Sequence, residues 1–495
     1  MQGTALRSAR AVCPTSKLAG CCPTSANLPT RRRGSHRQRT NIMTKRSLGL
    51  QIPAMSNMAA PKAASIKSAP KATKKAPMKA PMRDLPIIAN WRNSQGSEPV
   101  ATVEYPFYTD VSISGEITCG PYSFLNPVSQ SDSPGNVTAA IVLRFNEYGA
   151  LYGPINRPST EKSDTGSYHG GDIVDEVSAL AALFLGARLR PGGMSRIFGA
   201  VSSGDPLGRP VGWKKEKPPQ NIRFKRRGPI VQSAVGFRSL ELLRPLSLIV
   251  RLSPEQCIAL VRAASFYNDA LWICESEPEL SWLMLVSAIE VVATSWDSSM
   301  GEPLERLQAS RPEFMEALQA LHVDAPAIVA KEFKDSLGAT RKFVDFCLAH
   351  MAAPPAMRPS SASQINWSAD FWRDALRKIY KYRSLALHAG IPFPAPLCEP
   401  PYVHLGDPAP VERGTIALAS ATLGGSWAAK DLPVNLNLFQ QFVREAILTW
   451  LAASTWPSGA SEFYERRPLY HSIANCLRKI APRREVSCCE NGTSG

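Results

Sequence analysis

Aspartate and glutamate are absent from the first 83 residues, although this segment carries 17 of the chain's 57 lysine and arginine residues. The remaining residues hold 40 basic and 41 acidic side chains, so the net charge of +16 belongs to the N-terminal segment. A charge excess confined to a tail describes the tail and not the folded part. The composition therefore excludes a generally basic nucleic-acid-binding domain.

Paired cysteines at zinc-ligand spacing are also missing. None of the 11 cysteines forms a CxxC pair, and an odd number scattered over a long chain does not indicate a disulfide framework. Cys347 and His350 share a helix face and would make half a zinc site, but no second pair has ligand spacing, so core packing is the better interpretation. We expect no metal ion, no other cofactor and a reducing cytoplasm.

Long hydrophobic runs are scarce as well. The best run, Trp282 to Trp296, is shorter than the roughly 18 uncharged apolar residues of a membrane span and contains Glu290. We therefore expect no membrane partner. Gly199 and Gly204 have the spacing of a phosphate-binding loop, but Asp205 stands where that loop needs lysine, which excludes nucleotide hydrolysis by that route.

Residues 1–85 consist mainly of arginine, serine, alanine, proline and lysine, and such a segment buries too little apolar surface to offset its chain entropy. We predict a disordered basic tail. Two interpretations stay open, because several internal methionines are possible translation starts and because a polybasic arm adds salt-sensitive affinity for nucleic acid.

Residues 86–252 have the pattern of an α+β domain with mostly antiparallel strands, whose role the sequence does not indicate. Asp172 is the expected N-cap of a helix that runs to about residue 189 and stops before Pro191. Short β-type runs are predicted as strands at Val100 to Phe107, Val111 to Thr118, Val137 to Phe145, Ile230 to Val235 and Leu246 to Leu252.

Residues 253–455 change to a helical period and predict an all-α bundle, and 456–495 form a C-terminal tail without a clear pattern. Ser253 and Pro254 have the residue types of an N-cap and first helical position. The predicted helices run from there to about 274, and then over 278–296, 312–321, 325–335, 338–352, 368–388 and 433–454.

The predicted helix 368–388 carries the most informative residues. Its apolar stripe leads at helical spacing to Arg383, which should therefore face the bundle or a cleft, and His388 follows one short turn later before Gly390. A guanidinium can hold a phosphate while an imidazole moves a proton on or off the 2′-hydroxyl of RNA. Five residues correspond to about 140° on a helix, so both groups flank one phosphate only if the helix ends or bends between them.

This segment resembles the HEPN superfamily, whose ribonuclease members carry an arginine, a polar residue, three further positions and a histidine at the end of a bundle helix. Here these are Arg383, Ser384 and His388. The earlier segment from Trp282 to Glu290 is similar to the W-L-x-L-x-x-A-x-E helix of Apea-like HEPN domains. The resemblance implies a homodimeric helical bundle with metal-independent endoribonuclease activity in a defence or toxin system. Many active members have Asn or Asp where this chain has Ser384.

Glu290 is the only charged residue between Glu279 and Asp297, and burying it is costly unless a cation neutralises it. Arg383 is the expected partner. Two roles stay open for Glu290, since it can orient the arginine or assist proton transfer in catalysis, or form half of a structural ion pair. The whole Arg and His arrangement can equally belong to a non-catalytic HEPN module that binds RNA or a partner protein, or to a purely structural bundle.

Residues 207–227 form a second candidate surface. Aromatic Trp213 and Phe224 lie among the basic residues, a composition suited to tracking a single-stranded backbone and stacking its bases, although charge runs more often form solvated loops. The residues predicted to bind nucleic acid are Lys214, Lys215, Lys217, Arg223, Lys225, Arg226 and Arg227.

Overall fold

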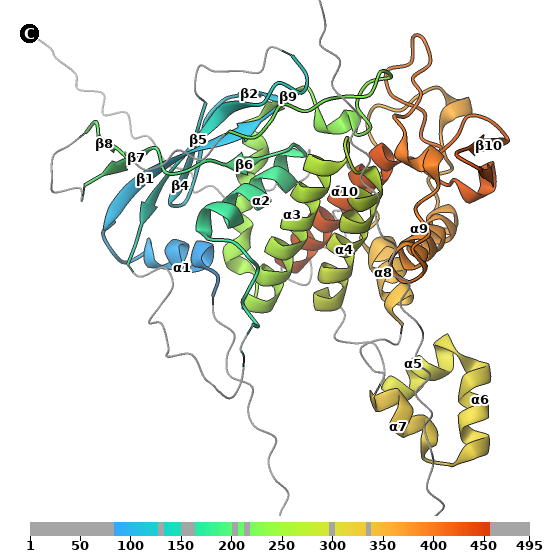
Figure 1. The fold of residues 1–495 in the computed structure, drawn as a ribbon. Helices are drawn as coiled ribbons and strands as arrows, with labels where there is room; N and C mark the ends of the chain where they lie inside the picture. Colours follow the sequence, from blue (N-terminus) through green and yellow to red (C-terminus); the bar gives the residue numbers. More distant parts are fainter. Residues whose placement is uncertain are drawn as a thin grey trace, which may run out of the picture. The chain divides into compact units, whose positions relative to one another are not determined.

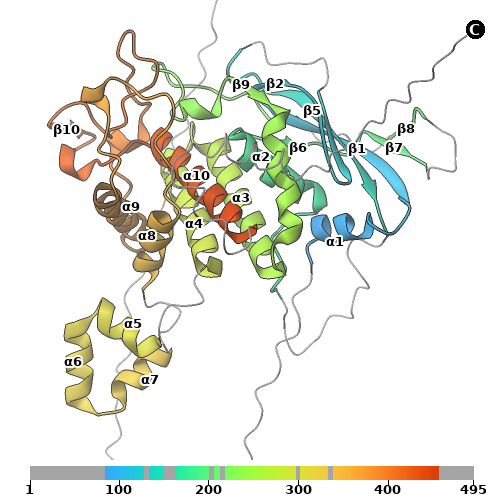
Figure 2. The ribbon, with the colours of Figure 1, turned by 180° about the vertical axis from the view of Figure 1, so that it is seen from behind.

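The computed structural model describes residues 84–126, 133–149, 163, 165–199, 206–211, 218–296, 302–332 and 338–455. Of the predicted N-terminal tail only Asp84 and Leu85 are described, and the predicted C-terminal tail lies outside the described residues. The described residues form a β-sheet region followed by several helices (Figures 1 and 2).

The main sheet is antiparallel, as its alternating sequence pattern predicts. Its centre is the long pairing of β1 (Ala101–Thr109) with β5 (Thr138–Glu147), in which Val103 lies opposite Phe145, and a bulge follows Phe107. A separate pair, β2 (Ser112–Ser114) with β9 (Phe237–Ser239), is parallel. The sheet order is β3 (Ile117–Cys119), β4 (Tyr122–Leu125), β5 (Thr138–Glu147), β1 (Ala101–Thr109), β7 (Arg196–Phe198) and β8 (Arg209–Pro210), with β6 (Arg190–Pro191) also on β1.

Helix α2 (Ile173–Leu185) begins where predicted. The Asp172 side chain accepts hydrogen bonds from the backbone N–H groups of Val174 and Asp175, and the Asp175 carboxylate accepts the N–H of Asp172 in return. This capping box satisfies N–H groups that the helix itself leaves unpaired. The helix ends four residues earlier than predicted, because Gly186 adopts the left-handed conformation at φ 63°.

Most of the longer helices match their predicted ranges. Ser253 caps α3 (Pro254–Ile273), and a proline begins both α3 and α4 (Pro278–Trp296), as expected. In both views α3 and α4 lie side by side, with α10 (Leu436–Thr455) beside them (Figures 1 and 2). The predicted helices are observed as α3 (Pro254–Ile273), α4 (Pro278–Trp296), α6 (Pro312–Leu321), α7 (Ala325–Glu332), α8 (Ala339–Ala349), α9 (Ala369–Ala389) and α10 (Leu436–Thr455).

Two predicted strands are wrong. Ile230 to Val235 contains the 3₁₀ turn η2 (Gln232–Ala234), and Leu246 to Leu252 overlaps the 3₁₀ helix η3 (Leu240–Arg251). A short apolar run is compatible with a buried helical turn as well as with a strand, so the periodicity of these residues does not distinguish the two structures. The predicted strand Val111 to Thr118 is two strands, β2 and β3, which belong to different sheets. Elements outside the predicted ranges are the strands β4, β6, β7, β8 and β9, the helices α1 (Pro86–Asn93) and α5 (Pro303–Ser310), the hairpin β10 (Ala419–Thr422) with β11 (Gly425–Ala428), and the 3₁₀ turns η4 (Ser361–Ser363), η5 (Ala395–Cys398) and η6 (Ala429–Asp431).

Sheet and helices share one hydrophobic core. A continuous cluster of buried side chains includes Phe107 of β1, Leu180 of α2, Trp282 of α4 and Trp450 of α10. The boundary predicted at residue 252 is thus crossed by packed side chains. Helices α5, α6 and α7 build a small core of their own around Leu307, Met315, Leu318 and Ala330.

Helix α4 has a long, mainly apolar sequence. By length and apolar composition it is the one described helix that could cross a membrane, although it contains two glutamates, Glu279 and Glu290. The expectation of no membrane partner stays a prediction, because the core helix of a soluble protein can have the same length and composition. In this structure α4 packs against α3, α8, α9 and α10, and 44% of its apolar window is buried.

A fully buried arginine joins the sheet to the helices. Arg188 follows α2 in the chain and is fully buried. Its guanidinium donates hydrogen bonds to the Asp110 carboxylate at 2.9 Å, to the Leu271 carbonyl at 2.7 Å and to the Glu275 carboxylate at 3.2 Å. Glu275 also accepts the backbone N–H of Ile230 at 3.0 Å. One side chain therefore ties the end of β1, the end of α3 and the loop before η2 together.

Replacing Arg188 with methionine should destabilise the fold strongly. The Arg188→Met variant keeps the apolar stem but leaves the buried Asp110 and Glu275 carboxylates without their cation, which costs about 3–5 kcal/mol. Urea unfolding of the full chain measures this cost. Arg341→Met is the control, because it removes an exposed pair with Asp345 and should cost less than about 1 kcal/mol. An equal loss in the free energy of unfolding for both variants would show that the buried ion pairs of Arg188 do not stabilise the fold more than an exposed pair does.

Candidate functional site

The predicted partners Glu290 and Arg383 meet where α4 packs against α9. The guanidinium Nη2 of Arg383 donates to Oε2 of Glu290 at 2.8 Å, and the two side chains are only 20% and 24% exposed. Arg383 thus faces neighbouring helices, as the apolar stripe of α9 predicts. Its buried Nε has no hydrogen-bond partner among the described residues, so part of its donor capacity is unused.

Tyr380 is a third member of this cluster, which was not among the predicted site residues. Its hydroxyl donates to Oε1 of Glu290 at 2.9 Å, and its ring lies under the guanidinium of Arg383, whose Cζ is 5.5 Å from the ring centroid. Burial and then the Glu290 charge raise the pKa of Tyr380 to about 12, so the hydroxyl keeps its proton. The sequence does contain a signal for Tyr380, because it is three residues before Arg383 and residues at this spacing are neighbours on a helix.

His388 lies apart from this cluster on the surface. It occupies the last turn of α9, is exposed, and its side chain makes no hydrogen bond or ion pair with the described part of the chain. Helix α9 runs without interruption through Arg383 and His388 to Ala389, and only Gly390 ends it with φ 64°. The end or bend needed between the two residues is absent, so one copy of α9 directs them about 140° apart.

Ser384 follows Arg383 on the same turn of α9 and is partly exposed. Its hydroxyl bonds to neither Arg383 nor His388 in the described structure. Of the four residues predicted as catalytic, the structure brings only two together. Glu290 and Arg383 form an ion pair, and Ser384 and His388 do not take part in it.

The basic segment is only partly described. Lys214, Lys215 and Lys217 lie outside the described residues. Arg223, Arg226 and Arg227 are exposed, as a nucleic-acid-binding surface requires. Lys225 differs, because its ammonium group donates to the Cys398 carbonyl at 3.2 Å and to the Glu399 carboxylate at 2.9 Å. Its charge is thus engaged within the chain, which the run of basic residues alone could not reveal.

No group of three or more His, Cys, Asp or Glu side chains is placed to hold a metal ion within the described ranges. Cys347 and His350 are buried, and the His350 ring packs against Trp296 and Phe346. Burial lowers the pKa of His350 to about 4 and raises that of the Cys347 thiol. These two residues therefore pack in the core, as their isolation in the sequence indicated.

A scan against protein-family models found no match to the chain, and searches of curated proteins and of solved structures found none either.

The buried His350 gives a prediction for the pH dependence of stability. The unfolded chain binds a proton at this residue below about pH 6.5, whereas the folded chain resists it until about pH 4, so acidification between these values favours unfolding. Between pH 7 and 4.5 His350 should lower the free energy of unfolding by roughly 2–3 kcal/mol. His350→Leu should remove that part of the pH dependence in urea titrations.

His322→Leu is the matched control, since His322 is exposed on the turn after α6. It should leave the difference between the two pH values unchanged. A His350→Leu variant with the same pH dependence as the wild type would show that the buried imidazole takes up a proton without opening the core.

Proposed function

We propose that this chain is a cytoplasmic, metal-independent endoribonuclease of HEPN type that acts in a defence or toxin system. The observation that supports this most is the Arg383 guanidinium. Glu290 and Tyr380 hold it in place, yet a fifth of its side chain stays exposed and its Nε has no partner among the described residues. A positioned, partly free guanidinium is suited to bind a phosphodiester and to stabilise the charge that develops on it.

The chemistry needs only RNA and a proton carrier. The 2′-oxygen attacks phosphorus while the bond from phosphorus to the 5′-oxygen breaks, which leaves a cyclic 2′,3′-phosphate and a 5′-hydroxyl. His388 takes the 2′ proton or gives one to the leaving oxygen. Its exposed position lets the imidazole exchange protons with solvent between turnovers.

Two copies of the chain are required, because the continuous helix α9 directs Arg383 and His388 to different faces. If the ends of two α9 helices pack together, the arginine of one copy can face the histidine of the other across one phosphate. Exposed apolar side chains beside His388 support such packing, since Leu387 is 52% and Ile391 51% exposed.

A second candidate function is a non-catalytic module that binds RNA or a partner protein. The same ion pair favours it, because Glu290 already neutralises much of the Arg383 charge. No carboxylate orients His388 within the described structure. In this case the chain would bind RNA without cutting it.

Cleavage of labelled tRNA and mRNA by the full chain in EDTA tests the first function. His388→Ala should lower the rate about 10²–10⁴-fold, the usual contribution of a general acid or base. Arg383→Lys, which keeps the charge but loses the planar fork, should also lose most of the activity. The products should carry cyclic phosphates or 3′-phosphates.

Controls come from the same chain. His322→Ala changes another exposed histidine, and Arg377→Ala removes an exposed guanidinium from the same helix α9. Neither should alter cleavage. A folded dimer that binds RNA but cuts none would favour the non-catalytic module, and cleavage unaffected by His388→Ala would exclude the proposed role of that residue.

The dimer has its own test. Leu387→Glu places a charge on the exposed apolar patch beside His388 and should convert the dimer into a monomer without RNA cleavage, measured by size-exclusion chromatography with light scattering. Leu321→Glu is the control, because Leu321 is 79% exposed on α6. A monomeric wild type that cleaves RNA would contradict the shared site.

A further inference from the structure

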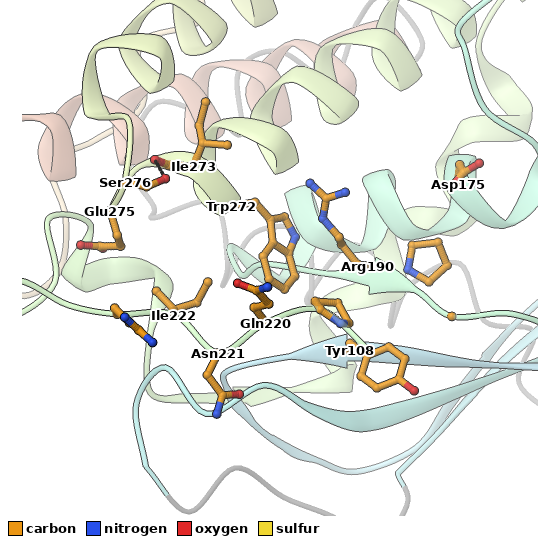
Figure 3. A pocket seen from close by; sticks show the side chains of 14 residues that line it. Tyr108, Asp175, Arg190, Gln220, Asn221, Ile222, Trp272, Ile273, Glu275 and Ser276 are labelled. Carbon is orange, nitrogen blue, oxygen red and sulfur yellow. Dashed lines mark hydrogen bonds between the residues drawn. The ribbon is translucent and has the colours of Figure 1, made fainter. Parts of the chain in front are cut away.

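A cavity of about 870 Å³ lies between the end of the sheet and the end of α3, and it shares no residue with the Glu290 and Arg383 cluster. Its volume falls in the range of small-molecule sites. In Figure 3, Glu275 and Ile222 lie at one end and Asp175 at the other, with Trp272, Gln220 and Arg190 between them.

The walls of the cavity are held in place by backbone contacts. Arg190 belongs to β6, which pairs with β1 opposite Tyr108. Residues 219–223 form another wall, because the Ile222 N–H donates to the Gly135 carbonyl at 2.8 Å and the Asn221 side chain accepts the Val137 N–H at 2.9 Å. This wall belongs to the basic segment 207–227, and Arg223 in it is one of the residues predicted to bind nucleic acid.

Trp272 gives the cavity a fixed aromatic plane. Its indole N–H donates to the Leu189 carbonyl at 3.2 Å, and the guanidinium carbon of Arg190 lies over the ring at 5.3 Å from its centroid. Nucleobases stack on aromatic rings and on planar guanidinium groups. A planar heterocycle is therefore the part of a ligand that this wall would bind.

Cations and amides complete the site. Arg223 is exposed at the cavity and suits a phosphate, and the amide groups of Gln220 and Asn221 suit the hydrogen-bonding edge of a base. The repulsion between the Glu275 carboxylate and a bound anion is reduced, because Arg188 and the Ile230 N–H already bind this carboxylate. Asp175 is engaged in the capping box of α2, at the far end of the cavity.

We propose that this cavity binds a nucleoside monophosphate unit, with the base against Trp272 and Arg190 and the phosphate on Arg223. Such a unit can come from a free nucleotide or from the 5′-phosphorylated end of an RNA strand. Both have the same base and phosphate, so the recognition chemistry is shared. The site is separate from the proposed catalytic residues and stands whether or not the chain cleaves RNA.

Isothermal titration calorimetry on the full chain tests this inference with the four nucleoside 5′-monophosphates and with a short oligoribonucleotide, with and without a 5′-phosphate. At least one of these ligands should bind saturably. Ribose 5-phosphate and inorganic phosphate should bind at least about tenfold more weakly than the best ligand, because they lack the stacked base. Binding of the free nucleotide identifies a metabolite site, and preference for the phosphorylated oligonucleotide identifies an RNA end.

The variant Arg223→Ala should weaken the best ligand at least about tenfold, the loss expected for one charge-assisted contact to phosphate. Arg227→Ala is matched to it, because Arg227 is an exposed arginine of the same segment that does not line the cavity, and it should change affinity less than about twofold. Both should unfold at the wild-type temperature.

Three results would overturn the assignment. These are no binding of any nucleotide or phosphorylated oligonucleotide, equal binding of inorganic phosphate, and equal losses in the two arginine variants. Each leaves the ribonuclease test untouched, since that test uses residues of α9 and this one uses residues 219–223 and 272.

Discussion

The buried charge of Arg188 is the constraint on which the arrangement of sheet and helices depends. Its guanidinium is fully buried and bonded to Asp110, Leu271 and Glu275, which belong to three different parts of the chain. An unpaired charge at this depth is strongly unfavourable, so all of these groups must be in place together. The hydrophobic core that runs from the sheet to α10 can then close around them.

Both candidate sites depend on the turn between α3 and α4, which this buried network holds in place. The end of α3, which Glu275 follows, forms one wall of the nucleotide cavity, so the buried network also positions Trp272. Helix α4 follows directly after this turn and carries Glu290 to α9. In the basic segment, residues 219–223 line the cavity, and Lys225 forms an ion pair with Glu399, which follows α9 in the chain.

The ion pair of Glu290 with Arg383 has opposite effects on the proposed catalysis. It fixes the guanidinium in a defined orientation, which favours binding of a phosphate without reorganisation. It also places a carboxylate beside that phosphate, which weakens the attraction. Tyr380 reduces this conflict, because its hydroxyl donates to the other oxygen of Glu290 and so disperses the negative charge.

The sequence by itself determined the elements whose signals are local. Prolines, with an N-cap serine for α3, determine where α3 and α4 begin, and alternating apolar and polar residues predict the central strands β1 and β5. The one charged residue in the apolar stretch of α4 after Glu279 indicated Glu290 and its partner Arg383. Tertiary structure decided what depends on distant groups. It made the apolar run after Pro245 a 3₁₀ helix and engaged Lys225 with Glu399. It also buried Arg188 between Asp110 and Glu275, because burial and ion pairing join residues far apart in the chain.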